Sequence, residues 1–396
     1  MNMNEQMKES EESILHTYNR FPVVFEKGQG CYLYDSEGKE YLDFAAGIAV
    51  NSLGYHYPEY DEALKDQIDK LMHISNLYYN EPIIEAGAKL VKASKMSKAF
   101  FTNSGTEAIE GALKAAKKYA YVRDGHADHE IIAMNHSFHG RSIGALSVTG
   151  TAHYREPFEP LMGGVKFADF NNLESVKAQI TDKTCAIITE VVQGEGGIYP
   201  AKKEFLEGLR QICDEKDIML IFDEIQCGMG RTGHYFAWQA YGVQPDIMTS
   251  AKALGCGVPV GAFVLNEKAA KASLEPGDHG TTYGGNPFVC AAVSKVFDIY
   301  ENDKIIEHVQ EMTPYLEQKL DEIVAKHECA ATRRGMGFMQ GIVIQGRPVG
   351  EVVKAALAKG LLVISAGSDV LRIVPPLVIT KEHIDKMAAI LDECME

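Results

Sequence analysis

Two short apolar segments, each followed by charged residues, constrain the fold of this chain more than any other feature of its sequence. Residues 218–222 run directly into Asp223, and residues 247–250 are followed closely by Lys252. Short apolar runs bounded by turn residues are typical of buried strands in a parallel sheet. Because ligands bind beyond the carboxyl ends of such strands, we expect Asp223 and Lys252 to face one crevice.

An aspartate and a lysine in this arrangement suit pyridoxal phosphate. That cofactor needs a lysine amine to bind its aldehyde and a carboxylate to keep its ring nitrogen protonated. Either residue alone would carry little weight, because a lone lysine is most often a solvated surface residue and a lone aspartate after a strand is usually a turn or cap residue. The order of the two residues and their small neighbours favour the functional interpretation.

The residues around this pair resemble the signature of the class III pyridoxal-phosphate aminotransferases. The resemblance is carried by Asp-Glu-Ile-Gln at 223–226, Gly-Arg-Thr-Gly at 230–233 and Ala-Lys-Ala-Leu-Gly-Cys-Gly-Val-Pro-Val-Gly-Ala at 251–262, and it extends along the whole chain. It implies the α/β architecture of fold-type I transferases, in which a large domain with a mostly parallel sheet flanked by helices accompanies a smaller α+β domain. It also makes Lys252 and Asp223 the catalytic pair.

The expected domains follow the same pattern along the chain. Residues 1–55 form an N-terminal segment that packs with the small domain and a dimer partner, residues 56–285 form the large cofactor-binding domain, and residues 286–396 form the small domain. Further strands are predicted at 98–101, 130–134, 184–189 and 260–264, with a hairpin over 28–44 and a helix over 58–71. From residue 286 the pattern predicts one long helix, a strand at 339–344, a helix from 349 and a strand at 361–364.

A phosphate site is predicted where the strand at 98–101 leads through Ser104, Gly105 and Thr106 into an alanine-rich helix. Free backbone N–H groups and the positive end of the helix dipole favour an anion at such a position. An ordinary serine cap with Glu107 in the first turn explains the same residues equally well. The resemblance assigns Gly105 and Thr106 to the cofactor phosphate.

The segment after the predicted strand at 130–134 offers an aromatic ring and an arginine. Phe138 can stack on a flat ring, and Arg141 can bind a carboxylate through two hydrogen bonds. His136 and His139 lie beside them, but no third ligand or His-Glu-x-x-His pattern accompanies them, so no metal site is predicted. By itself Arg141 would more often be a surface ion-pair residue. The resemblance places Phe138 over the cofactor ring and Arg141 on the substrate carboxylate.

Other site residues are implied by the resemblance alone. Gln226 is expected to hydrogen-bond the ring hydroxyl of the cofactor, and Arg372 to bind the carboxylate of glutamate or 2-oxoglutarate. Glu195 is expected to pair with a substrate-binding arginine and to release it for the second substrate. Val191 stands where the family usually has proline, and we expect only a small backbone adjustment there.

A homodimer is implied by two threonines in the loop before residue 286. In the family, Thr282 binds the phosphate of the neighbouring subunit's cofactor, and the position of Thr281, commonly serine, contacts substrate. The substrates implied are an ornithine-type amine and 2-oxoglutarate, with glutamate as product, and the resemblance is greatest to enzymes acting on N2-acetylornithine. Enzymes for succinylornithine, ornithine and 4-aminobutyrate share every catalytic residue named here, so these donors remain alternatives.

Residues 228–233 spell Gly-x-Gly-x-x-Gly, which suggests a nicotinamide oxidoreductase as an alternative function. A dinucleotide fingerprint should join a strand directly to a helix, whereas here five residues separate it from the end of the strand and an aromatic segment follows. We therefore interpret it as a glycine-rich turn. A non-catalytic protein with the same fold is disfavoured because the lysine, the two arginines and the phosphate loop all occur together.

The composition limits the class of protein further. The net charge of −16 argues against a general nucleic-acid or anionic-membrane surface. The eight cysteines form no Cys-x-x-Cys pair, and several have apolar neighbours typical of buried thiols in a reducing compartment. No apolar run approaches the roughly 20 residues of a membrane helix. We expect a soluble, cytoplasmic enzyme.

Overall fold

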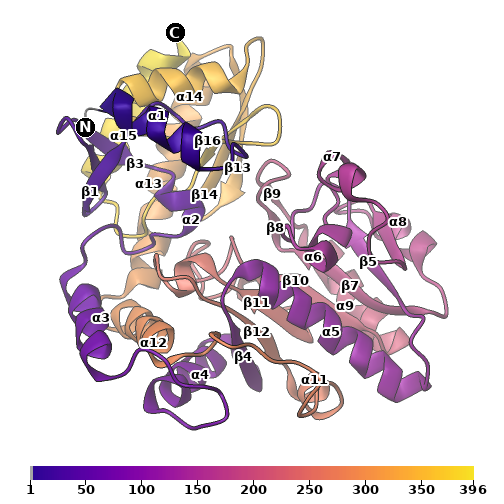
Figure 1. Cartoon of the computed structure of the whole chain (residues 1–396). Helices are drawn as coiled ribbons and strands as arrows, with labels where there is room; N and C mark the ends of the chain where they lie inside the picture. The colour runs from indigo at the N-terminus through magenta and orange to yellow at the C-terminus, as the bar shows by residue number, and fades with distance from the viewer. Residues whose placement is uncertain (1–2) are drawn as a thin grey trace.

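The computed structural model describes residues 3–396, so residues 1 and 2 of the expected N-terminal segment lie outside it. Its centre is a seven-stranded sheet in the order β4-β12-β11-β10-β7-β5-β6 (Figure 1). In that order the strands are Lys98–Thr102, Gly261–Leu265, Ile247–Ser250, Met219–Asp223, Thr184–Glu190, Glu130–Met134 and Val165–Ala168. From β11 to β6 all neighbours are parallel, whereas β12 runs antiparallel to β11 and β4. The mostly parallel sheet of the expected fold is confirmed.

Helices cover both faces of this sheet. The helices of the chain are α1 Met3–Ser13, α2 Ala46–Ala49, α3 Pro58–Lys70, α4 Glu81–Ser94, α5 Gly105–Asp124, α6 Ile143–Ser147, α7 Ala152–Arg155, α8 Leu173–Gln179, α9 Lys203–Lys216, α10 Trp238–Tyr241, α11 Glu267–Lys271, α12 Pro287–Asn302, α13 Ile305–Lys326, α14 Val349–Ala358 and α15 Lys381–Met395. Short 3-10 turns occupy Glu156–Phe158 and Lys252–Leu254. In Figure 1, α5 crosses the near face of the sheet.

The central strands are buried on both faces, which explains their continuous apolar sequences. Every residue of β7, β10 and β11 is buried. Successive side chains point to opposite faces of a strand: Ile188 belongs to the same core as Ala112 of α5, whereas Ile187 belongs to the core that contains Leu209 of α9. The sheet is therefore held between two apolar layers, and its strand ends are fixed in position.

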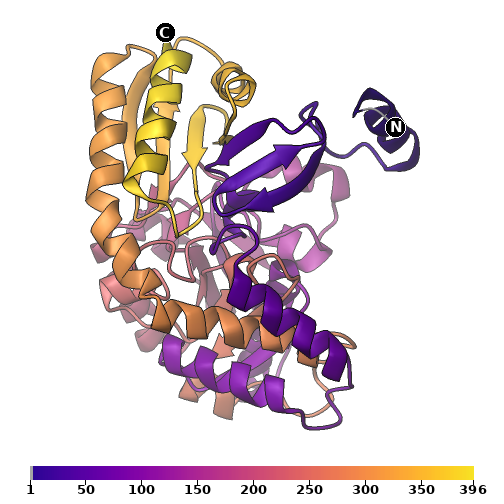
Figure 2. The ribbon, with the colours of Figure 1, turned by 90° about the vertical axis from the view of Figure 1, so that its left-hand side faces the viewer.

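The N-terminal and C-terminal parts of the chain lie side by side (Figure 2). One sheet has the order β1-β2-β3-β15, with strands Phe25–Gln29, Tyr32–Asp35, Glu40–Asp43 and Leu361–Leu362. Another has the order β13-β14-β17-β16, with strands Ala330–Met336, Met339–Ile344, Val370–Ile373 and Ile364–Ala366. A two-stranded sheet joins β8, Val192–Gln193, to β9, Tyr199–Pro200. The pairing of β3 with β15 joins segments more than 300 residues apart.

Three local expectations need correction. The single long helix expected from residue 286 is two helices, α12 and α13, because Lys304 takes a left-handed conformation with φ of 53° and ends the first helical run. The strand expected at 361–364 is divided between β15 and β16, which pair with different sheets. Strands β1 and β13 were not predicted, because neither carries an apolar alternation; β1 is mostly exposed and β13 mostly half-buried.

None of the helices in residues 3–396 is both long and apolar enough to cross a membrane. The cysteines are free, and all except the half-buried Cys329 are buried.

Candidate active site

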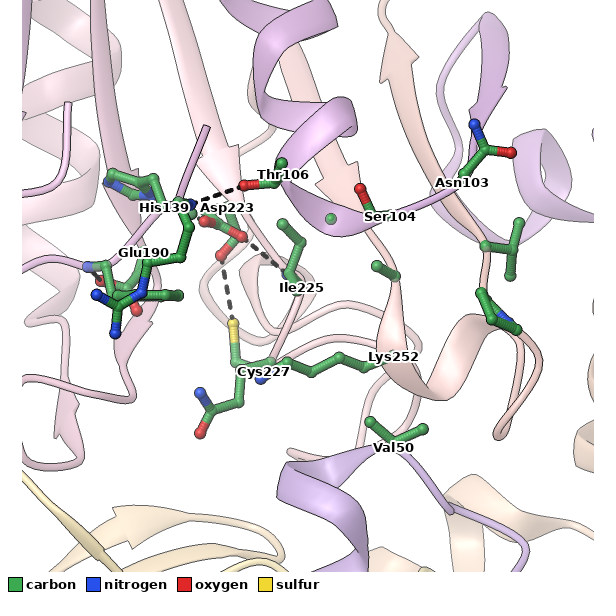
Figure 3. A pocket seen from close by; sticks show the side chains of 18 of the residues that line it. Val50, Asn103, Ser104, Thr106, His139, Glu190, Asp223, Ile225, Cys227 and Lys252 are labelled. Carbon is green, nitrogen blue, oxygen red and sulfur yellow. Dashed lines mark hydrogen bonds and ion pairs between the residues drawn. The ribbon is translucent and has the colours of Figure 1, made fainter. Parts of the chain in front are cut away.

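A pocket of about 500 Å³ opens at the carboxyl ends of β7, β10 and β11, beside the first turn of α5 (Figure 3). The structure brings most of the sequence-predicted site residues into its wall: Ser104, Gly105, Thr106, Phe138, Arg141, Asp223, Gln226 and Lys252. Asp223 ends β10, and Lys252 opens the 3-10 turn after β11. The parallel strands therefore carry both side chains to one edge of the sheet.

Asp223 is buried and held by several hydrogen bonds. Its Oδ2 lies 2.7 Å from Nδ1 of His139, and its Oδ1 accepts from the backbone N–H of Ile225 at 3.0 Å and from the hydroxyl of Thr249 at 3.3 Å. The remaining nitrogen of His139, Nε2, is buried and has no partner among residues 3–396. These contacts fix the carboxylate in orientation.

Lys252 is poised to react as a neutral amine. Burial lowers the pKa of its amine to about 8, and the positive charge of Arg372 acts in the same direction. The negative charges of Glu195 and Asp223 oppose this shift without cancelling it. Lys252 itself has a left-handed backbone, with φ of 51°. A non-glycine residue in this region is uncommon and tends to occur where function requires it.

The first turn of α5 forms a cradle for an anion. Ser104 is the N-cap, and its hydroxyl accepts from the N–H of Glu107 at 3.2 Å, as an ordinary cap would. The N–H groups of Gly105 and Thr106 have no acceptor in the described part of the chain, and both residues line the pocket. A side chain at Gly105 would place its Cβ 2.9 Å from the side chain of Ile225. The cap and the anion site are therefore compatible, because different donors serve each.

Arg372 lies beside this pocket and is already paired. Its Nη1 is 2.6 Å from Oε1 of Glu195 and donates to the Gln226 side chain at 3.1 Å, while Nη2 donates to the carbonyl of Ser365 at 3.1 Å. Arg372 is buried, and its Nε has no partner in residues 3–396. It also lines a second cavity of about 970 Å³ together with the segment around Phe21.

The two threonines of the loop before α12 are placed differently from each other. Thr281 reaches the pocket rim, because its hydroxyl accepts from the side-chain amide of Asn103, a lining residue, at 3.2 Å. Thr282 is exposed and does not line the pocket of its own chain.

His139 and Glu190 are two site residues whose positions the sequence reasoning missed. From the sequence, His139 is only a possible metal ligand, whereas in the structure its ring contacts Asp223. Glu190 is buried and accepts from the N–H groups of Phe138 and Gly194 at 3.3 and 3.1 Å. Burial and the neighbouring Asp223 charge raise the pKa of Glu190 well above its usual range. It ends β7 just as Asp223 ends the adjacent β10, and that shared pattern could have identified it.

One possible metal-ligand cluster lies far along α5 from the pocket. Within residues 3–396 it is the single group of three such side chains, and it consists of Asp124, His126 and His129. Both carboxylate oxygens of Asp124 already receive hydrogen bonds from Arg123, at 2.6 and 2.5 Å. That pairing disfavours a cation at this place, because binding one would separate a tight ion pair.

The residues present fit pyridoxal phosphate. A reactive lysine, a fixed carboxylate and a helix N-terminus with free N–H groups lie in one pocket. Lys252 would hold the aldehyde carbon, Asp223 the ring nitrogen, and Gly105 and Thr106 the phosphate. Phe138 in the wall offers an aromatic face for the ring.

Comparisons with known proteins agree with this geometry. The sequence model of the family described as Aminotransferase class-III matches residues 14–395. The chain is 47% identical to the acetylornithine aminotransferase of Clostridium acetobutylicum, over 98% of this chain and 100% of that protein. It is 48% identical to the acetylornithine aminotransferase of Methanocaldococcus jannaschii, over 96% of this chain and 95% of that protein.

Solved structures show the same fold. The ornithine aminotransferase of Toxoplasma gondii superposes with a TM-score of 0.95 at 28% identity, covering 100% of this chain and 95% of that one. The N-acetylornithine aminotransferase of Stenotrophomonas maltophilia superposes with a TM-score of 0.84 at 35% identity, covering 98% of each chain. The chain belongs to the class III aminotransferases, enzymes that depend on pyridoxal phosphate.

Proposed function

We propose that this enzyme transfers the terminal amino group of N2-acetyl-L-ornithine to 2-oxoglutarate and forms glutamate. The observation that carries the proposal is a pair of arginines beside one reactive lysine. Arg141 has no ion-pair partner in residues 3–396, whereas Arg372 is paired with Glu195. Two substrates that both bear carboxylates but differ in length can use such a pair in turn.

The donor follows from the relatives. Acetylornithine aminotransferases are 44% to 48% identical to this chain over nearly its whole length. A succinylornithine transaminase of Yersinia pseudotuberculosis is 44% identical over 94% of this chain, so the succinyl derivative is the second candidate donor. Ornithine and 4-aminobutyrate remain further alternatives. A nicotinamide site at 228–233 is not supported, because this segment is a turn that opens no helix.

When bound, pyridoxal phosphate supplies an aldehyde that takes up the donor amine and a protonated ring that draws in the electrons of the cleaved C–H bond. Asp223 holds the proton on the ring nitrogen, and His139 keeps Asp223 in place. Gln226 orients the ring hydroxyl. Lys252 Nζ would accept the proton from the donor carbon and deliver it to the carbon that was the cofactor's aldehyde carbon, acting first as base and then as acid.

The two arginines work in sequence in this scheme. In the first half-reaction Arg141 binds the donor's carboxylate, while Glu195 neutralises Arg372. In the second half-reaction Glu195 releases Arg372, which binds the carboxylate next to the keto carbon of 2-oxoglutarate. Two substrates that share one lysine require a ping-pong order, with one product leaving before the second substrate enters.

A homodimer with sites completed by the neighbouring subunit forms part of the proposal. The segment after α3 exposes several large apolar side chains, among them Leu77 at 87% and Tyr79 at 95%. It packs beside the loop of Thr282, since His73 and Tyr283 have ring centroids 5.4 Å apart. Large exposed apolar patches mark protein interfaces. A second copy on this surface would bring an exposed Thr282 towards the partner's phosphate cradle.

The division into residues 1–55, 56–285 and 286–396 is also a proposal. It is supported by the sheets, because every strand of the central sheet lies within residues 98–265. The smaller sheets take their strands from residues 25–43 and 330–373, apart from the short β8–β9 pair.

The visible absorption spectrum of the purified protein tests the proposed function. We expect a yellow protein that bleaches on addition of N2-acetyl-L-ornithine without any keto acid, and regains its colour with 2-oxoglutarate. Bleaching by ornithine or 4-aminobutyrate alone would keep the reaction class and replace the donor. A colourless protein that cannot be reconstituted with pyridoxal phosphate would overturn the whole scheme.

A further inference from the structure

Arg141 is held in place by an aromatic ring and not by an acid. Its guanidinium carbon lies 3.9 Å from the ring centroid of Tyr154 and 5.3 Å from that of Phe138. Its backbone N–H donates to the hydroxyl of Thr106 at 3.0 Å. No carboxylate of residues 3–396 forms an ion pair with it, although the side chain is exposed. The positive charge is therefore oriented but left free.

Tyr154 belongs to α7, a short helix outside the pocket wall. Its ring meets the ring of Phe138 edge to face, with centroids 6.0 Å apart and planes at 81°. On the other side it contacts the ring of His153, with centroids 4.0 Å apart. Tyr154 is half-buried, so neighbours restrict the ring that supports Arg141.

Stacking occupies the flat face of a guanidinium and leaves its edge available. The N–H groups of arginine lie in the plane of the group, and a carboxylate binds them edge-on through two parallel hydrogen bonds. A ring against the face limits the side chain's rotation without competing for those donors. An acid in the same place would occupy the donors, as Glu195 does at Arg372.

We propose that Tyr154 is a positioning residue that presents the edge of Arg141 to the carboxylate of the amino donor, and so determines the preference for donors that carry one. This inference rests on the proposed function, in which Arg141 binds the donor. Tyr154 itself touches neither the donor nor the cofactor in this scheme.

Two donors that differ only in the carboxylate test this role. N-acetylputrescine is N2-acetylornithine without its carboxylate, and each half-reaction is followed separately by absorbance. In Tyr154→Leu we expect KM for N2-acetyl-L-ornithine to rise about three- to fivefold, the scale of a cation–π contact at an exposed site. The kinetics with N-acetylputrescine should stay within twofold of wild type. Tyr154→Phe keeps the ring and should restore the wild-type KM.

The chain offers a matched control on the same helix. The guanidinium carbon of Arg155 lies 4.0 Å from the ring centroid of Phe167, a stack of the same kind on residues that do not line the pocket. Phe167→Leu removes that stack and should leave the preference between the two donors unchanged. An equal change with Phe167→Leu would show that α7 matters only for folding, and would overturn the proposal.

The remaining outcomes separate this inference from the proposed function. If wild type turns over N2-acetylornithine and Tyr154→Leu changes its KM less than twofold, the role of Tyr154 is wrong and the function stands. Equal losses with both donors would place the effect on the cofactor through Phe138 and would also overturn it. If the wild-type enzyme does not turn over N2-acetylornithine, the proposed function itself is wrong.

Discussion

The two sides of the pocket are built differently. On the cofactor side, Asp223 receives hydrogen bonds from a histidine, a hydroxyl and a backbone N–H, all within the segment that forms the central sheet. On the substrate side, Arg141 is exposed and rests on an aromatic ring, and Arg372 comes from the distant strand β17. On the first side the carboxylate is hydrogen-bonded through both oxygens, whereas on the second at least one charge is free and another can exchange partners.

This difference follows from what each side must do. A cofactor that stays through both half-reactions needs groups that do not move, and several short bonds to one carboxylate prevent movement. Two substrates of different length need binding groups that can change state between the half-reactions. The single ion pair of Arg372 with Glu195, at 2.6 Å, is such a group, because its carboxylate partner is one-quarter exposed.

Removal of the lysine should have the largest effect on the cofactor side. We expect Lys252→Ala to lose at least about 10⁴-fold in turnover, because the base that moves the proton is gone. Covalent attachment of the cofactor should also disappear, as borohydride reduction followed by mass spectrometry would show. Lys252→Arg is the control that keeps the charge. A reducible adduct at wild-type level in Lys252→Ala would refute the assignment.

Substitution of Asp223 should cause the second-largest loss of turnover. Asp223→Asn keeps the shape but loses the charge that holds the ring proton, and we expect turnover to fall about 10²- to 10³-fold. The protein should still bind cofactor, which an absorbance titration can measure. Thr249→Val removes one of the hydrogen bonds to Asp223 and should cost much less. Near-normal turnover in Asp223→Asn would show that the fixed carboxylate is not required.

The residues on the cofactor side of the pocket could be predicted from the sequence more readily than the contacts on the substrate side, for a physical reason. Asp223, Lys252 and Gly105 lie at the ends of sheet strands or the start of a long helix, and apolar runs and small residues reveal those places. The parallel sheet itself follows from the same runs. Contacts between such elements are regular, so their ends converge on one edge.

Side-chain partners in loops could not be predicted in this way. The bond between His139 and Asp223 joins residues 84 positions apart, and the stack of Arg141 on Tyr154 depends on the path of an irregular segment. No periodic pattern encodes either contact. The break at Lys304 was missed although four polar residues, Glu-Asn-Asp-Lys at 301–304, interrupt the apolar pattern there and could have signalled it.

The pKa of Lys252 gives a third test of the cofactor side of the pocket. Burial and the Arg372 charge lower it to about 8, so the neutral amine is the minority form below that pH and the majority form above it. The rate of covalent cofactor uptake by the apoenzyme should therefore rise about tenfold per pH unit up to pH ~8 and then level off. Stopped-flow absorbance measures it. A rate that still rises steeply at pH 9 would indicate an ordinary, solvated lysine.

The smallest expected change concerns the exchangeable pair on the substrate side. Glu195→Gln keeps a hydrogen-bonding oxygen beside Arg372 but removes the negative charge, so the guanidinium binds the carboxylate next to the reacting carbon of glutamate with less competition. We expect the ratio of kcat/KM for glutamate to that for N2-acetylornithine to rise about fivefold, the scale of one charge-assisted hydrogen bond. Kinetics of each half-reaction, followed separately, measure kcat/KM for glutamate and for N2-acetylornithine. A parallel loss in both half-reactions would mean that the ion pair serves stability alone, and that the two sides of the pocket do not differ in the way their bonding indicates.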